Sequence, residues 1–480
     1  MKNNKLIRLL ANVERREMSR FVEFVGSPFH NKREDVRRLV AYLSEVYPRF
    51  DEQTCDRQRL FRLLFPGEKH EQARLALVFT YTQRLLQQFL EWEAFQEEQA
   101  GPRTRLLKQL RRRRQYDLYE KELNKSRRQL QQTAYQTAAY HRLQYQLAAE
   151  ADRYFAELGR HEHDDHIEDK QEQLDLYFLT EKLKDACEMV VRKRILKVSY
   201  SLHLLPHVLE EVRDRWNYYR QVPSVSVYFL LYRLLNGEPD ISFDEIWTAL
   251  QETQPYFPPE EQQLVYNYLQ NYCIEQINRG QTPYLRKALE IYQTQLSKEL
   301  IFVNDHLPEW HYKNIVTIGL RLRENQWVYD FIHHYRERLH PSVAENAYTF
   351  NLASFLYSTG RLGEVLELLH RVEYKDIRYY LGARSLLLRT YYDLEEYDAL
   401  LSLSDAFQQF LQRNRLLADD RVQAFRNLLR FTKKAMILRE RSPYLSKTRF
   451  GEEIDKLNRG IERTRVMINK DWLLQKVAEL

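Results

Sequence analysis

The sequence predicts an all-α protein, and three observations support that prediction. Glycine and proline together make up about 5% of the 480 residues, against about 12% in average proteins. β-Sandwiches, propellers and barrels need a turn about every 8–12 residues, so this composition excludes them. Between the few glycines and prolines, apolar residues recur with gaps of three and four, the spacing of a single helix face. A hydrophobic content of 44% is enough for a folded core despite 30% charged residues.

Residues 1–100 are expected to form an N-terminal helical module of about five short helices, ending at Gly101–Pro102. Its clearest helix contains Leu75, Phe79, Leu86 and Leu90, which lie on one apolar stripe. Residues 103–221 are expected to form long helices, because no glycine or proline occurs between residues 103 and 158. Residues 222–480 are expected to form helix pairs joined by short turns and closed by C-terminal capping helices.

Three polar residues have the spacing of a helix capping box. Asn31, Ser242 and Ser342 are each followed three residues later by glutamate. In a capping box the first side chain accepts a hydrogen bond from a free backbone N–H, and the acid accepts one from the N–H of the capping residue. We therefore expect a helix to begin at each of the three positions.

A repeat occurs in the third region. Trp327, Leu362 and Tyr397 are each 35 residues apart, and each follows an apolar helix and a polar turn and opens an amphipathic helix. This pattern resembles tetratricopeptide (TPR) repeats, whose period is 34 residues. The copy with Gly360 in its turn matches best. The resemblance implies an α-solenoid of TPR-like helix pairs, in which one helix of each pair lines a concave groove.

The N-terminal segment carries a second resemblance. The run 21–31, Phe-Val-Glu-Phe-Val-Gly-Ser-Pro-Phe-His-Asn, followed by Leu-Phe-Pro-Gly at 64–67, resembles the start of a family of uncharacterised bacterial helical proteins. It implies a bacterial, cytoplasmic protein and no particular chemistry.

Cys55, Cys187 and Cys273 form no CxxC pair, and such an odd, scattered set is typical of reduced, buried thiols in a cytosol. No window approaches 18 apolar residues, so no membrane span is expected.

Catalytic and cofactor motifs are absent from the sequence. It contains no GxGxxG, GxxxxGK[ST] or GxSxG motif, so we expect no enzyme activity and no cofactor.

His161, His163 and His166 alternate with three carboxylates, and both ligand types can coordinate divalent metals. The run resembles an exposed loop with no distant fourth ligand, so we expect a solvated acidic loop and no metal site.

The strongest charge feature is a basic segment between residues 103 and 128, with 11 Lys or Arg against three acids. We expect a basic helix 103–128 that carries the basic patch Lys108, Arg111, Arg112, Arg113 and Arg114. Such a patch could contact phosphates without reading sequence; the alternative is a solvated helix face. A nucleic-acid-associated factor using this helix is the second functional hypothesis.

The first hypothesis is a non-catalytic protein–protein interaction scaffold. Aligning the 35-residue units on Ile318, Ala353 and Leu388 identifies positions that, by the TPR resemblance, face the concave groove. The candidate groove residues, which would bind a peptide or helix of another protein, are Arg323, Asn351, Tyr357, Arg389 and Tyr392. An amide and a guanidinium can hold a peptide backbone, and tyrosines offer rigid contact area. The alternative is that these tyrosines pack between neighbouring helices.

Overall fold

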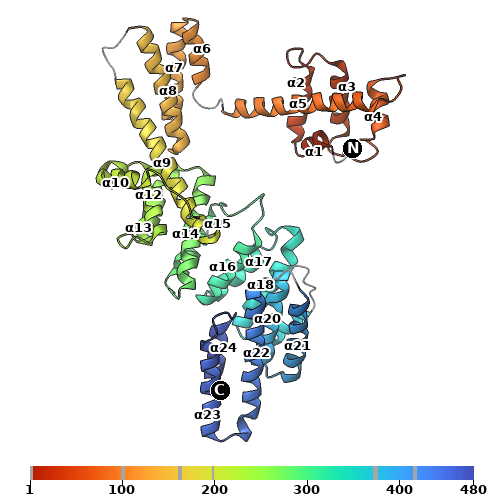
Figure 1. Cartoon of the computed structure of the whole chain (residues 1–480), viewed down its shortest axis with the longest axis vertical. Coiled ribbons are helices and arrows are strands. Elements are labelled where there is room, and N and C mark those ends of the chain that lie inside the picture. Colours follow the sequence, from red (N-terminus) through yellow and green to blue (C-terminus); the bar gives the residue numbers. More distant parts are fainter. Residues whose placement is uncertain (1–3, 99–102, 160–164, 197–198, 371–376, 415–418) are drawn as a thin grey trace. The chain divides into compact units, whose positions relative to one another are not determined.

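The computed structural model describes residues 4–98, 103–159, 165–196, 199–370, 377–414 and 419–480 (Figure 1). It is 77% helical, with 24 α-helices and no β-strand among these residues. The prediction of an all-α protein is confirmed. None of the described helices combines the length and the apolar character needed to cross a bilayer.

The chain divides into two units, Met1–Phe257 and Pro258–Leu480. The sequence analysis placed residues 222–257 with the C-terminal region, whereas the structure places them in the first unit. The reason is that α12 (Pro223–Asn236) packs along α9 (Asp165–Leu196). Twelve residues of α12 are buried, as expected for a helix that is apolar on all sides.

The first unit begins with the N-terminal module expected from the sequence. Its helices are α1 (Lys5–Leu10), α2 (Arg15–Gly26), α3 (Glu34–Val46), α4 (Arg57–Leu64) and α5 (Gln72–Glu98). Buried residues from all five helices form one hydrophobic core. In this core Phe89 of α5 packs against Phe21 and Phe24 of α2, with ring centroids 5.5 and 5.6 Å apart.

A second core in the first unit is built by α6 (Thr104–Arg112), α7 (Tyr116–Gln131) and α8 (Ala138–Glu157). The rings of Tyr119 and Tyr154 stack in this core with centroids 4.1 Å apart. The single basic helix expected through 103–128 is wrong, because the chain turns between α6 and α7. Arg114 adopts a left-handed conformation (φ 56°), and the Gln115 N–H then donates to the Leu110 carbonyl at 2.9 Å, which closes α6 without glycine or proline.

The first unit ends with α9, α12 and four short elements. These are α10 (Leu205–Asp214), α11 (Trp216–Tyr219), α13 (Phe243–Thr253) and the 3-10 helix η1 (Gln254–Tyr256). The hydroxyls of Thr180 in α9 and Ser224 in α12 lie 3.0 Å apart in the buried contact between these helices. Their hydrogen bond satisfies two polar groups that would otherwise be costly to bury.

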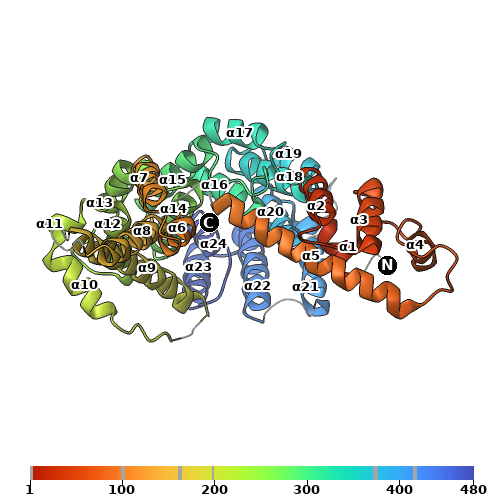
Figure 2. The same cartoon turned by 90° about the horizontal axis from the view of Figure 1, so that it is seen from above.

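The second unit consists of helix pairs followed by a C-terminal group of three α-helices and one 3-10 helix. These elements can be followed in Figures 1 and 2. The pairs are α14 (Pro259–Asn278) with α15 (Tyr284–Ser297), α16 (Glu309–Arg321) with α17 (Asn325–His334), α18 (Pro341–Ser358) with α19 (Leu362–His370), and α20 (Ile377–Asp393) with α21 (Tyr397–Arg413). The C-terminal group contains α22 (Asp419–Arg441), the 3-10 helix η2 (Ser442–Tyr444), α23 (Lys447–Glu462) and α24 (Lys470–Ala478). The first helices of successive pairs also pack together, α16 on α18 and α18 on α20.

All four pairs share one kind of turn. Between α14 and α15 the left-handed residue is Gly280, and the Gln281 N–H bonds the Gln276 carbonyl at 3.0 Å. The last three pairs repeat it. Arg323, Gly360 and Glu395 are left-handed, with φ values of 60°, 79° and 59°. After each of them, the next N–H bonds the carbonyl five residues earlier, at 2.9–3.0 Å, which is the Schellman motif.

The turns give the structural register of the repeat. The turns at Arg323, Gly360 and Glu395 are spaced 37 and then 35 residues apart, so the repeat copy that contains Arg323 is shifted by two residues from the 35-residue alignment. Counted from the turn, the position equivalent to Ala353 and Leu388 is Val316 rather than Ile318. Arg323, a candidate groove residue, is itself the turn residue.

Of the three helix starts expected from capping-box spacing, the one at Ser242 is confirmed, with the serine half of the box formed, and the other two are wrong. The Glu245 N–H donates to the Ser242 hydroxyl at 3.2 Å, and Ser242 begins α13. Asn31 is instead buried in the loop before α3, where its amide donates to the Val25 carbonyl at 3.1 Å. The helix expected at Ser342 begins earlier, with His340 as the capping residue, because a proline follows His340 at the first helical position.

We expect two glycine-to-alanine substitutions to change stability in opposite directions. A methyl group on Gly319 would overlap the Val328 side chain where α16 meets α17, whereas one on Gly451 in α23 would meet nothing within 4 Å. Gly319→Ala should therefore destabilise by about 1–3 kcal/mol through overpacking. Gly451→Ala should stabilise by about 0.5–1 kcal/mol through helix propensity. Urea unfolding followed by circular dichroism measures both, and equal effects would contradict the packing at Gly319.

The turn after α16 generates a second prediction. Arg323 has a β-carbon in a left-handed conformation, which costs about 1–2 kcal/mol relative to glycine. Arg323→Gly should therefore raise the free energy of unfolding by about 1 kcal/mol. Arg323→Ala is the matched control, because it removes the same side chain and keeps the β-carbon. If alanine stabilises as much as glycine, the effect comes from the lost charge and the left-handed turn is not its cause.

Candidate partner-binding site

Three of the five candidate groove residues come together in the second unit, where α18, α20 and α24 meet. Tyr357 belongs to α18, and Arg389 and Tyr392 belong to α20. The Arg389 guanidinium lies 4.3 Å from the Tyr357 ring centre and 5.9 Å from the Trp472 ring centre. Trp472, on α24, packs edge-on against Tyr392 with ring centroids 5.6 Å apart. A cation and three aromatic rings therefore join these helices.

Polar bonds fix α24 in the same place. The Tyr357 hydroxyl donates to the Asp393 carboxylate, and the Lys476 ammonium lies 3.2 Å from the other oxygen of Asp393. The Asp393 side chain is only 14% exposed, so this ion pair is partly shielded from water and is stronger than a surface pair. At the start of α24, the Asn469 amide donates to the Ser385 hydroxyl at 2.8 Å.

We call Tyr357, Arg389, Tyr392, Asp393, Trp472 and Lys476 the α24 contact. Burial raises the pKa of Tyr392 to about 12 and also raises the pKa of Tyr357. Burial lowers the pKa of Arg389. Desolvation opposes the charge on Lys476, but hydrogen bonds to Glu479 and Asp393 raise its pKa overall. Both tyrosines stay neutral and Lys476 stays charged at neutral pH, which suits a binding surface better than proton transfer.

The other two candidate groove residues lie outside the α24 contact. Asn351 is 1% exposed, and its amide donates to the Ala347 carbonyl of its own helix at 2.8 Å. Arg323 is exposed at the turn after α16. Tyr392 is also only 1% exposed. Tyr392 thus packs between neighbouring helices, the alternative that the sequence analysis left open for the tyrosines.

The sequence analysis missed the α24 half of this contact. Trp472 and Lys476 lie outside the repeat alignment, about 80 residues from the α20 residues that they touch. The sequence analysis expected only C-terminal capping helices in this part of the chain, and no motif pointed to Trp472 or Lys476. That capping role is compatible with the packing of α24 against α22 and α23.

The basic patch is divided between buried and exposed residues. The Arg111 side chain is 10% exposed and bonds Glu150 of α8 at 2.7 Å and also Glu157. These two carboxylates hold the pKa of Arg111 above its usual value and make it a structural residue. The exposed members of the patch are Lys108, Arg112, Arg113 and Arg114. A single face through Lys108 and Arg111 is therefore not available to phosphates.

The candidate metal ligands lie largely outside the described residues. His161 and His163 fall in the segment 160–164, and His166 lies in α9 without a described side chain. Elsewhere in the described chain, no three His, Cys, Asp or Glu side chains gather as metal ligands do. Cys55, Cys187 and Cys273 are buried, as expected, and form no disulfide with one another. Burial raises the pKa of all three thiols.

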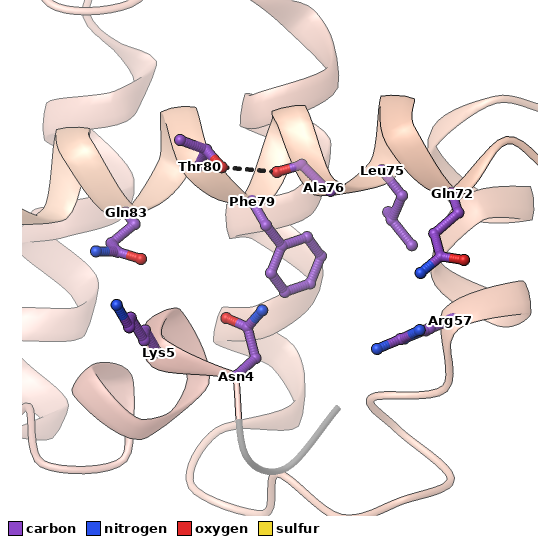
Figure 3. Close-up of a pocket in the computed structure, with 9 residues that line it drawn as sticks. All are labelled: Asn4, Lys5, Arg57, Gln72, Leu75, Ala76, Phe79, Thr80 and Gln83. Atoms are coloured by element: carbon purple, nitrogen blue, oxygen red, sulfur yellow. Dashed lines mark hydrogen bonds between the residues drawn. The ribbon is translucent and has the colours of Figure 1, made fainter.

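A small cavity of about 230 Å³ lies between α1, α4 and α5 in the N-terminal module (Figure 3). Phe79 forms its apolar wall, and Lys5, Arg57, Gln72 and Gln83 supply polar groups. The hydroxyl of a further lining residue, Thr80, already donates to the Ala76 carbonyl at 2.9 Å. The described lining holds no carboxylate, imidazole or thiol, so it offers no acid–base pair for catalysis.

The cation–aromatic contact predicts an energetic coupling between α20 and α24. Arg389→Ala and Trp472→Ala should each lower the free energy of unfolding, and the double variant should lose less than the sum by about 1 kcal/mol. Urea unfolding of the four proteins measures this coupling. As a control, Trp472→Ala combined with Gly451→Ala should be additive, because Gly451 has open space around it. Strict additivity of the Arg389 and Trp472 effects would show that the two side chains do not interact.

Comparison with known proteins does not indicate a function for these residues. No family model, no curated protein and no solved structure matches the chain. The α24 contact and the exposed basic residues are therefore interpreted from their own chemistry. The α24 contact is the stronger candidate, because it joins residues from three helices in a mixed aromatic and charged surface.

Proposed function

We propose that the chain is a non-catalytic scaffold that binds an amphipathic helix of another protein. In this proposal the second unit is an α-solenoid of TPR-like pairs, and α16, α18 and α20 line its concave groove. One observation supports the proposal. Three residues that the sequence analysis predicted to bind a partner helix contact α24, a helix of the same chain. Tyr357, Arg389 and Tyr392 contact α24, which supplies Trp472 as the anchor.

The side chains of α24 that contact the proposed groove indicate which side chains a partner helix would need. Trp472 and Lys476 are four residues apart, so they lie on one helix face, and Leu473 and Val477 beside them are 0% exposed. Helix-in-groove recognition uses this spacing of apolar anchors. A partner helix with an aromatic residue followed four positions later by a cation would repeat the contacts to Arg389 and Asp393.

The resident helix also affects the affinity of any partner. A partner must displace α24 before it reaches the groove, so its apparent affinity falls by the fraction of molecules in which the groove is open. Loosening α24 should therefore strengthen partner binding. The competing interpretation is that α24 is only a terminal cap that shields the last apolar face of the array. In that case, loosening α24 would destabilise the chain and create no binding site.

A labelled peptide of residues 466–480 distinguishes these interpretations. The full-length variant Trp472→Ala/Lys476→Gln should bind this peptide at least about tenfold more tightly than the wild type, because its own helix no longer fills the groove. Fluorescence anisotropy measures the affinity, and a scrambled peptide controls for non-specific binding. Adding Arg389→Ala should abolish the gain, because it removes the groove side of the contact.

Tyr444→Ala is the control variant. Tyr444 is in the same unit, lies on η2 outside the proposed groove helices and is 87% exposed, so its removal should leave peptide affinity at the wild-type value. If the loosened variant keeps its helical spectrum but binds the peptide no better than the wild type, the groove is not a helix-binding site. If the loosened variant does bind the peptide more tightly, a pull-down with that variant as bait, repeated after nuclease treatment and analysed by mass spectrometry, would identify the partner that the peptide mimics.

A further inference from the structure

A groove between α6 and α8 in the first unit gathers basic side chains that are distant in the sequence. It has a volume of about 890 Å³, and its described lining comes from α5, α6 and α8. Its cationic residues are Arg103, Arg105, Lys108, Arg142 and Arg153. Arg142 and Arg153 lie outside the basic segment identified from the sequence, so folding brings two separate sets of cations to one groove. We call these five residues and the space between them the basic groove.

The described carboxylates of the groove lining do not neutralise the positive charge of the basic groove. Glu150 is the one carboxylate in the described lining, and its side chain is 5% exposed and bonded to Arg111 at 2.7 Å and Arg153 at 3.4 Å. Within the described part of the chain, no ion pair engages the other four cations of the groove. The groove therefore holds a positive potential that attracts a polyanion.

We propose that the basic groove binds single-stranded nucleic acid through its phosphate backbone. Four of the five cations are arginines, whose planar guanidinium groups can hold phosphate with two hydrogen bonds. Arg142 and Arg153 are eleven residues apart on α8, which spans about 16 Å along the helix. That length allows successive phosphates of one strand to be contacted together.

Aromatic rings and the shape of the groove favour a single strand over a duplex. Tyr145 and Phe95 also line the groove, and the Arg105 guanidinium lies 4.7 Å from the Phe95 ring centre. Single-strand binding combines a cationic groove with ring faces on which bases stack. Duplex reading instead needs a protruding element that enters a DNA groove, whereas this surface is concave. The site is independent of the proposed helix-binding groove in the second unit.

The chain offers a control with the same charge change. The groove variant is Arg105→Gln/Lys108→Gln/Arg142→Gln, and the control variant is Arg112→Gln/Arg113→Gln/Arg114→Gln. Both remove three exposed cations, but the control residues lie at the end of α6 and do not line the groove. Total charge is therefore equal in the two variants, and only the position of the lost cations differs.

Fluorescence anisotropy of a labelled 15-nucleotide poly(dT) strand with full-length protein, over a salt series from ~50 to ~200 mM, tests the proposal. We expect the wild type to bind and the groove variant to bind at least about tenfold more weakly, with a salt slope shallower by about 2 for three lost contacts. The control variant should bind within about threefold of the wild type. Tyr145→Ala should weaken binding by about fivefold or more with an unchanged salt slope, because it removes stacking and no charge.

Three outcomes would overturn the proposal. No binding by the wild type at ~50 mM salt would exclude a nucleic-acid site. Equal losses in the groove and control variants would show attraction by overall charge only. Equal competition by a 15-residue poly-glutamate peptide would identify acidic protein segments as the ligand. Because both triple variants change exposed side chains, circular dichroism should confirm an unchanged fold, and Arg142→Gln/Arg153→Gln provides a second groove variant on α8 alone.

Discussion

The hydrogen bond that closes a helix after a left-handed residue recurs in both units, and the packing of the helices depends on it. It joins the N–H following the left-handed residue to the carbonyl five residues before that N–H and satisfies helix-end groups that would otherwise need water. The residues that hold the left-handed position are Arg114, Gly237, Gly280, Glu299, Arg323, Gly360 and Glu395. Four of the seven are not glycine, so a chain with only 12 glycines still turns sharply and often.

Short turns bring consecutive helices together, and small residues then set how closely they pack. Gly319 faces Val328 between α16 and α17, and a β-carbon on Gly382 would lie 2.8 Å from the Phe350 ring between α18 and α20. Such close packing buries the apolar faces and leaves the polar faces for other contacts. In the second unit α24 covers part of those faces through aromatic and charged groups, which is why the candidate binding site and the end of the chain coincide.

Arginine serves opposite purposes in this protein, and local sequence does not distinguish them. Arg111 belongs to a run of four arginines but is buried against Glu150 and Glu157 of another helix. Arg389 is isolated in the sequence and lies between aromatic rings of two helices. Arg142 is equally isolated, yet it lines an open cationic groove. Whether an arginine stabilises or binds depends on which carboxylates and rings the fold brings to it.

The sequence by itself determined the all-α class, the N-terminal module and the helix pairs, because apolar periodicity and scarce glycine and proline are local signals. It also predicted that Tyr357, Arg389 and Tyr392 act together as groove residues, and the structure brings these three side chains to one contact. Only the tertiary structure showed that Trp472 of α24 fills the space beside them, and that the arginine run is broken at Arg114. The physical reason is the sequence range of each signal. The apolar periodicity of a helix lies within about 20 consecutive residues, so it can be recognised locally. The contact between α20 and α24 joins residues about 80 positions apart, and nothing in their local sequence indicates that they meet.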